Sequence, residues 1–224
     1  YLGLCAELGS YKMCEMFLQH PQCHVNDLIT VLNLKAATKQ KEEVQTTVLQ
    51  LAARAKQADV VALLIKFGAD VNLQDHHGYT ALHRACAVNS YKVAKLLLEH
   101  GADANARTFT GGTALLFAIE MHGDAVLCEL LLSHHADCNL SILGGSPLHF
   151  AAQIGRLDLV RLLLQQEDVL VDKPKDDLSN VSALQFSALG GHLEICRALI
   201  LRGADIKRRT KEGHTPLFLG QCTV

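Results

Sequence analysis

Histidine and cysteine are the residues of this chain that could hold a metal ion or act as catalytic groups, and there are 12 His and 8 Cys. The densest group of them is His122, Cys128, His134, His135 and Cys138. Zinc sites use ligand pairs at regular short spacings, such as C-x2-C or H-x3-H, and this group has no such order. The spacing therefore predicts no metal site.

A smaller group, His20, Cys23 and His24, is equally irregular. The chain contains no nucleophile elbow, phosphate-binding P-loop, HExxH helix, CxxC pair or glycine-rich dinucleotide turn. We therefore expect no catalytic residues, no cofactor and no enzymatic activity.

The elements that position these side chains come from an internal repeat. Residues 68–105 begin and end on nearly the same phrase, Gly-Ala-Asp followed by Val-Asn or Ala-Asn. The unit between them has about 33 residues, the period of ankyrin repeats. The run Gly78-Tyr79-Thr80-Ala81-Leu82-His83 resembles the G-x-T-P-L-H signature of that family, and the run from Val93 to Leu98 resembles its second helix. The resemblance implies an all-α fold, an ankyrin-repeat solenoid of stacked helix-turn-helix units with hairpin-like loops. It also implies that His83 and His149 form hydrogen bonds between neighbouring repeats.

Repeat copies recur in phase along almost the whole chain, which predicts a single domain over residues 1–224. The predicted repeats cover approximately residues 1–20, 47–74, 75–107, 108–140, 141–172, 177–207 and 210–224, with an insertion at 21–46. The first and last repeats are incomplete, and Leu217, Phe218 and Leu219 lack a covering repeat. We therefore expect the chain to be an excerpt of a larger protein.

The insertion is rich in helix-forming residues, particularly between Lys35 and Glu43. These propensities favour one or two extra helical turns with a mobile polar segment. A partner-binding role for the insertion remains the alternative.

Hydroxyl side chains stand where they can cap the first helix of each repeat, and glycines stand where second helices end. The capping positions are Thr80, Thr113, Ser146, Ser182 and Thr215, with Pro147 and Pro216 at the first helical residue. The helix-ending glycines are Gly68, Gly101 and Gly203. Because His135 and Glu167 replace this glycine, we expect two less regular turns there.

Most cysteines fall on small or apolar helix positions, where a free thiol acts as a core residue. These are Cys5, Cys14, Cys86, Cys128 and Cys196. The sequence shows no signal peptide and no apolar run of membrane-spanning length. Reduced thiols of this kind predict a cytoplasmic or nuclear location without membrane insertion.

Hydrophobic side chains recur at the predicted loop tips and at the ends of the first helices, where a solvated turn has no local reason to hold them. In ankyrin proteins these positions form a concave groove, so we predict a protein or peptide partner there. The predicted binding residues are His76, His77, Tyr79, Val88, Phe109, Thr110, Met121, Ile142, Leu143, Ile154 and Leu178. The alternative is that the tips pack on one another and only brace the stack.

The charge balance gives no sign of a nucleic-acid partner, because the formal net charge is −2. The one basic run, Lys207, Arg208, Arg209 and Lys211, is interpreted as a solvated loop. As a fragment the chain is expected to be monomeric.

Three asparagines, Asn72, Asn105 and Asn139, each follow a leucine eight residues earlier. This arrangement resembles the ankyrin pattern hydroxylated by the cellular asparaginyl hydroxylase, so we predict possible hydroxylation there. The alternative is that these asparagines only brace their loops.

The resemblance predicts a non-catalytic interaction scaffold, the recognition module of a larger adaptor or regulatory protein. Three narrower roles remain open: substrate recognition in a SOCS- or BTB-type ubiquitin-ligase adaptor, an inhibitor-of-NF-kappaB-like regulator, and a regulatory domain that binds a small ligand on an enzyme or channel. A small-ligand site would need a pocket of cations and aromatic rings, whereas the predicted groove is apolar.

Overall fold

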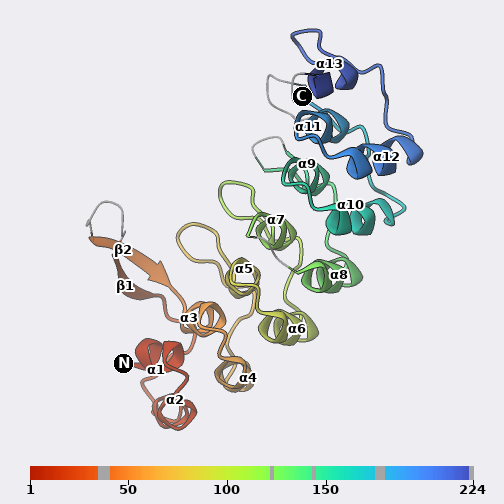
Figure 1. The fold of residues 1–224 in the computed structure, drawn as a ribbon. Helices are drawn as coiled ribbons and strands as arrows, with labels where there is room; N and C mark the ends of the chain where they lie inside the picture. Colours follow the sequence, from red (N-terminus) through yellow and green to blue (C-terminus); the bar gives the residue numbers. More distant parts are fainter. Residues whose placement is uncertain (35–40, 122–123, 143–144, 175–179, 222–224) are drawn as a thin grey trace. The chain divides into compact units, whose positions relative to one another are not determined.

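The computed structural model describes residues 1–34, 41–121, 124–142, 145–174 and 180–221, and these form two compact units, Tyr1–Phe109 and Thr110–Val224 (Figure 1). The elements of the first unit are α1 (Leu2–Glu7), α2 (Tyr11–Leu18), β1 (Ile29–Leu34), β2 (Lys41–Thr46), α3 (Val48–Arg54), α4 (Ala58–Lys66), α5 (Ala81–Ala87) and α6 (Tyr91–Glu99). Those of the second are α7 (Ala114–Glu120), α8 (Ala125–Ser133), α9 (Pro147–Gln153), α10 (Leu157–Leu164), α11 (Ala183–Leu189), α12 (Leu193–Leu201) and α13 (Pro216–Gln221). The predicted all-α repeat fold is confirmed, with one β-hairpin added to it.

Each unit consists of two layers of helices. In the first, α1, α3 and α5 pack side by side, and α2, α4 and α6 form the second layer. In the second, α7, α9, α11 and α13 form one layer, and α8, α10 and α12 the other. We call the first-named layer of each unit the inner helices and the other layer the outer helices.

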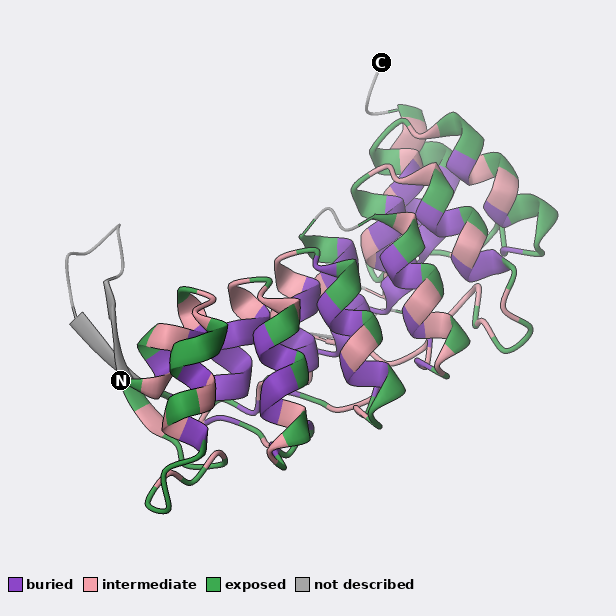
Figure 2. Ribbon diagram, turned by 90° about the horizontal axis from the view of Figure 1, so that it is seen from below, coloured by how far each residue is buried: buried purple, intermediate pink, exposed green. Residues whose placement is uncertain are grey.

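The core of each unit lies between its two layers, where buried faces meet (Figure 2). Outer helices contribute one leucine each at equivalent positions, and Leu64, Leu97 and Leu131 are all 0% exposed. Inner helices contribute small residues, among them Ala52 and Ala85, also 0% exposed. Alanine lets neighbouring inner helices approach closely, so a short helix pair gains its stability from its neighbours.

The predicted caps begin the inner helices. Thr47, Thr80, Thr113 and Ser182 each accept a hydrogen bond from a backbone N–H three residues further on. Thr215 accepts one in the same way, from Phe218 N at 3.3 Å. These bonds satisfy an N–H that the first helical turn leaves without a partner.

The turn at His135 corrects one expectation. Gly101 ends α6 with φ of +83°, and His135 ends α8 in the same left-handed region with φ of +63°. The backbone hydrogen bonds around the two residues also match: Gly101 N to Leu98 O corresponds to His135 N to Leu132 O. The side chain therefore tolerates the strain, and the turn at His135 is regular.

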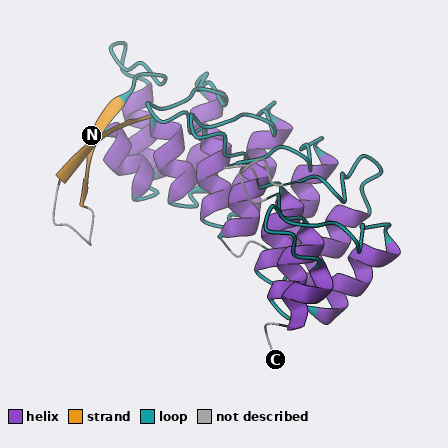
Figure 3. Ribbon diagram, turned by 90° about the horizontal axis from the view of Figure 1, so that it is seen from above, coloured by secondary structure: helices purple, strands orange, loops and turns teal. Residues whose placement is uncertain are grey.

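The insertion corrects another expectation, because it forms a hairpin rather than helix (Figure 3). Strands β1 and β2 pair antiparallel from Ile29 opposite Thr46 to Leu34 opposite Lys41. The β-branched residues Ile29, Thr30 and Val31 favour a strand, and pairing across the hairpin outweighs the helix propensity of Lys41, Glu42 and Glu43. The predicted segment at 35–40 lies outside the described residues.

A glutamine at the third residue of two inner helices holds the loop of the next repeat. Gln50 Nε2 of α3 donates to Leu73 O at 3.1 Å and Tyr79 O at 2.7 Å, which holds the next loop in place. Gln185 of α11 makes the matching pair of bonds, to Arg208 O and His214 O, both at 3.1 Å. The residue of α1 that aligns with this position is Gly3, and Ile29 of the hairpin occupies the space where a side chain there would lie. Because glycine has no side chain, α1 makes no such link.

Candidate functional site

The loop tip of the first unit brings four of the predicted binding residues together. The rings of His76 and His77 lie 3.8 Å apart, and Phe109 N donates to His77 O at 3.0 Å. The Phe109 side chain is 73% exposed. We call His76, His77, Tyr79 and Phe109 the aromatic tip.

The ion pair between Arg84 and Asp75 contacts both the ring and the backbone of Tyr79. The Arg84 guanidinium lies 4.1 Å from the centre of the Tyr79 ring and donates to Asp75 Oδ2 at 2.6 Å. The Asp75 side chain is fully buried, and its Oδ1 accepts from His77 N and Tyr79 N, both at 2.9 Å. Because the carboxylate organises the whole turn, the tip is preorganised before any partner arrives.

In the second unit, two predicted residues occupy the same position in neighbouring inner helices. Met121 follows α7 and Ile154 follows α9, and they are 50% and 37% exposed. Leu189, the last residue of the adjacent α11, is 49% exposed. We call Met121, Ile154 and Leu189 the apolar strip.

The remaining predicted residues differ in their surroundings. Ile142 is half-buried and pairs with Gly145 through backbone bonds of 3.0 and 2.9 Å. Val88 is half-buried at the end of α5, and Thr110 is exposed. Leu143 and Leu178 lie outside the described residues.

The predicted asparagines join successive loops. Asn72 Nδ2 donates to Gly101 O at 3.0 Å, and its Oδ1 accepts from Asp103 N at 2.8 Å. Asn139 makes the same pair of bonds, to Asp168 O at 2.9 Å and from Leu170 N at 2.8 Å. Asn72 and Asn139 thus each supply both a donor and an acceptor to the loop of the next repeat.

Sequence reasoning missed a fourth member of this series. Asn26 donates to Gly68 O at 3.2 Å and accepts from Asp70 N at 2.8 Å. The signal was present, because Leu18 precedes Asn26 by the same eight residues. At the equivalent position before α11, Asp172 accepts from Asp205 N at 2.9 Å but has no amide to donate.

Cys138 lies with two carboxylates rather than with the histidines next to it in sequence. Ligand atoms of Asp137, Cys138 and Asp168 all lie within 4.8 Å of one another. The thiol donates to Asp168 Oδ1 at 3.7 Å, and burial, then the charge of Asp168, raises the pKa of Cys138 to about 12. The cysteine is therefore a neutral core thiol that donates a hydrogen bond. Of the predicted cluster, His122 lies outside the described residues.

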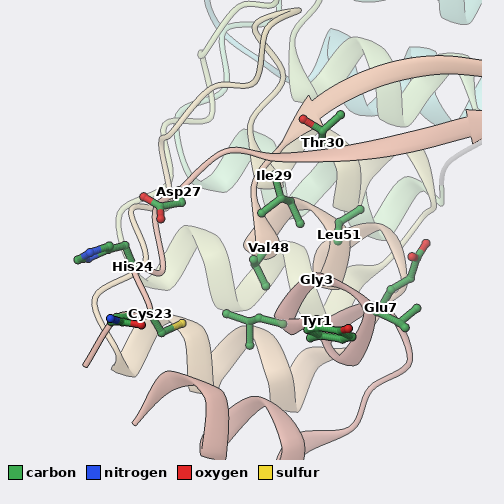
Figure 4. A pocket seen from close by; sticks show the side chains of 13 residues that line it. Tyr1, Gly3, Glu7, Cys23, His24, Asp27, Ile29, Thr30, Val48 and Leu51 are labelled. Carbon is green, nitrogen blue, oxygen red and sulfur yellow. The ribbon is translucent and has the colours of Figure 1, made fainter. Parts of the chain in front are cut away.

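A hollow of about 530 Å³ opens beside α1 (Figure 4). Gly3, Ile29, Val48 and Leu51 give it an apolar lining. Glu7 is occupied by an ion pair with Arg54 at 2.8 Å and lies at the opposite end from His24. Cys23 and Asp27 line the same end of the hollow as His24.

His83 behaves as the resemblance implies. Its Nδ1 accepts from Thr80 N at 3.0 Å, which leaves the proton on Nε2, and Nε2 donates to Ala106 O of the next loop at 3.0 Å. His149 makes the first of these two bonds, because its Nδ1 accepts from Ser146 N at 3.2 Å. His83 thus joins two repeats, whereas this bond of His149 lies within its own repeat and does not show the predicted link between repeats.

Comparisons with known proteins agree with this geometry. The family "Ankyrin repeats (3 copies)" matches residues 2–108 and 107–174, and "Ankyrin repeat" matches residues 180–211. The chain belongs to the ankyrin-repeat family, whose domains are generally non-catalytic modules for binding other proteins. No helix in the described part of the chain is both long and apolar enough to span a bilayer.

Among curated relatives, the chain is 32% identical to the nuclear factor NF-kappa-B p105 subunit of Gallus gallus over 205 residues, which are 89% of this chain and 16% of that protein. It is also 32% identical to neurogenic locus notch homolog protein 1 of Xenopus laevis over 127 residues, 56% of this chain and 5% of that protein. The chain therefore spans a small part of these relatives.

Among solved structures, the ankyrin repeat domain of Bcl-3, described as a member of the IkappaB protein family, matches with a TM-score of 0.79 and 29% identity, over 97% of this chain and 92% of that one. The human ASB11 ankyrin repeat domain matches with a TM-score of 0.76 and 24% identity, over 97% and 90%. The second likeness is one of fold alone.

Proposed function

We propose that this chain is a non-catalytic recognition module that binds a partner protein or peptide through the aromatic tip and the apolar strip. The observation that carries the proposal is the exposure of large apolar side chains at equivalent inner-helix ends, Met121 and Ile154, together with Phe109 at a loop tip. Exposed apolar side chains that recur from repeat to repeat are typical of interaction surfaces, and such anchors contribute most of the binding energy.

The test compares two sets of substitutions in affinity purification from cell lysate. The inner set is Phe109→Ala, Met121→Ser and Ile154→Ser. The outer set is Tyr91→Ala, Val126→Ser and Leu193→Ser, which changes residues that are 41%, 53% and 61% exposed on outer helices. We expect partners to be lost with the inner set and retained with the outer set.

Circular dichroism and thermal melting would show that both variants remain folded. Partners retained by the inner set, or lost equally with both sets, would contradict the proposal. The alternative, in which the tips pack on one another and only brace the stack, would then be favoured.

A narrower second candidate is an inhibitor-of-NF-kappaB-like regulator that binds a transcription factor. Support for it comes from the match to p105 over 89% of the chain and the likeness to Bcl-3. Binding of purified NF-kappaB dimers to the wild type, with loss in the inner set, is the expected result. Failure of this test with other partners still captured would leave the broader proposal standing.

A further inference from the structure

The loop that joins α12 to α13 carries half of the lysine and arginine residues of the second unit. Between residues 202 and 214 it contains five cations, Arg202, Lys207, Arg208, Arg209 and Lys211, against two anions, Asp205 and Glu212. The excess of three positive charges (5 − 2) contrasts with the net charge of −2 for the whole chain. Positive charge is thus concentrated on one segment.

The exposure of this segment alternates. Lys207, Arg209 and Lys211 are exposed, whereas Arg208 and Thr210 between them are half-buried. Lys207 and Lys211 lie in two turns, closed by the bonds from Arg208 N to Asp205 O at 3.3 Å and from Gly213 N to Thr210 O at 2.9 Å, and Arg209 lies between them. We call Lys207, Arg209 and Lys211 the basic strip.

Among the described residues, the arginines of the loop, but not its lysines, are held by carbonyl oxygens. Arg209 Nη1 donates to Gly213 O at 2.9 Å, and Arg208 Nη1 donates to Asp172 O at 2.8 Å. A carbonyl oxygen fixes a guanidinium without cancelling its charge, so less rotamer freedom is lost when an anion binds.

The acids of the loop are engaged elsewhere. Asp205 Oδ1 accepts from Lys207 N at 2.8 Å, and Glu212 lies 3.3 Å from His214 Nδ1. Within the described ranges, no carboxylate forms an ion pair with the basic strip; Asp176 and Asp177 of the preceding loop fall outside them. Lys207, Arg209 and Lys211 are themselves exposed.

Equivalent loops of the first unit do not share this pattern. The matching positions are Asn72, Gln74 and His76 in one loop and Asn105, Arg107 and Phe109 in the next. The fold requires no cations there, so the charge of the last loop is not needed to build a repeat.

We propose that the basic strip docks an extended acidic segment of a partner protein. The three cations are exposed and outnumber the acids of the loop, so they complement the carboxylates of such a segment. Duplex nucleic acid usually needs a broader basic face than one loop provides. The basic strip is separate from the aromatic tip and the apolar strip, so each proposal can fail without the other.

The experiment uses fluorescence anisotropy of a short labelled peptide with Glu at every second position and Ser between, and a matched peptide with Gln in place of Glu. The test variant is Lys207→Gln, Arg209→Gln and Lys211→Gln. The control, Lys66→Gln, Lys92→Gln and Lys95→Gln, removes the same charge from exposed positions of the first unit. Loss of three exposed ion pairs should weaken binding of the Glu peptide about tenfold in the test variant. The control should bind as the wild type does.

A second variant guards against a change in loop structure. Lys207→Glu with Lys211→Glu leaves Arg209 and its bond to Gly213 intact and should weaken binding at least as much. Raised salt should weaken wild-type binding, because exposed charges are screened.

Equal binding of the Gln peptide, equal loss in test and control variants, or unchanged binding in the Glu variant would each overturn the proposal. So would stronger binding to duplex RNA, or to phosphatidylserine-containing vesicles, than to the Glu peptide.

Discussion

At the residue scale, the asparagines that join successive loops show what the donor bond and the acceptor bond of one side chain each contribute. Asn72 provides both a donor and an acceptor to the next loop, whereas Asp172 in the equivalent place provides only acceptors. An exposed contact can therefore lose one bond and still join two repeats.

We predict that Asn72→Ala lowers the free energy of unfolding by about 1–2 kcal/mol, because two hydrogen bonds to the loop are lost. Asn72→Asp should cost about half as much, since a carboxylate can still accept from Asp103 N. Urea denaturation of the three proteins measures both values. An equal cost for the two substitutions would show that the acceptor bond contributes nothing.

Hydroxylation of Asn72, Asn105 and Asn139 remains a prediction. An added oxygen on at least one of them is expected in mass spectrometry after co-expression with the asparaginyl hydroxylase. Asn26, with the same leucine spacing and the same pair of bonds, is a further position to inspect. No added oxygen at any of the three predicted asparagines would contradict the prediction.

The thiols should differ strongly in reactivity. Burial raises the pKa of Cys14 to about 11 and those of Cys128 and Cys138 to about 12. Near pH 8, only about one in ten thousand molecules of a thiol with pKa 12 is in the thiolate form. Because the thiolate is the nucleophile, a thiol with a raised pKa is alkylated only at a more alkaline pH.

Iodoacetamide near neutral pH should therefore label the half-buried Cys5, Cys23 and Cys196 before Cys14, Cys128 and Cys138. Mass spectrometry of native and denatured samples gives the order. Rapid labelling of Cys128 in the native protein would place it outside the core that the structure assigns to it.

At the element scale, the sequence predicted the inner helices well because their starts depend on local chemistry. A hydroxyl at Thr80 or Ser182 and a proline at position 147 or 216 determine a helix start through contacts within one turn. The hairpin could not be predicted in this way, because β1 and β2 stabilise each other only across the turn. The links made by Gln50 and Gln185 were also missed, since they join atoms 23 and 29 residues apart.

The next loop is held by a glutamine in α3 and by a histidine in α5, and the glutamine should contribute more to stability. We predict that Gln50→Ala costs about 1–3 kcal/mol, because the buried Thr46 hydroxyl and two loop carbonyls lose a partner. Gln50→His should recover part of that cost, since His83 makes one such bond in the next helix. Thermal unfolding tests the order, and a histidine variant as weak as the alanine variant would argue against a polar link.

At the scale of the whole molecule, the repeat resemblance predicted which side chains are buried, because each helix pair repeats the same contacts. It could not predict exposure at single tips: Phe109 is 73% exposed, whereas Ile142 at the next tip is half-buried beside Gly145. Ile142 pairs with Gly145 within its own tip, whereas Phe109 N bonds to His77 O of the preceding loop. The prediction of one domain over residues 1–224 is best tested by how destabilisation spreads.

Leu82 in α5 and Leu148 in α9 offer a matched pair for that test, since each is the second residue of its inner helix and 1% exposed. Truncation of either to Ala should cost about 2–5 kcal/mol by leaving a cavity. In a stack where each repeat contacts only its neighbours, the loss should be largest near the substitution. Hydrogen exchange should therefore show Leu82→Ala lowering amide protection mainly in residues 1–109, and Leu148→Ala mainly in residues 110–224. An equal loss of protection throughout the chain in both variants would mean that the repeats unfold together as one cooperative unit, rather than through nearest-neighbour contacts.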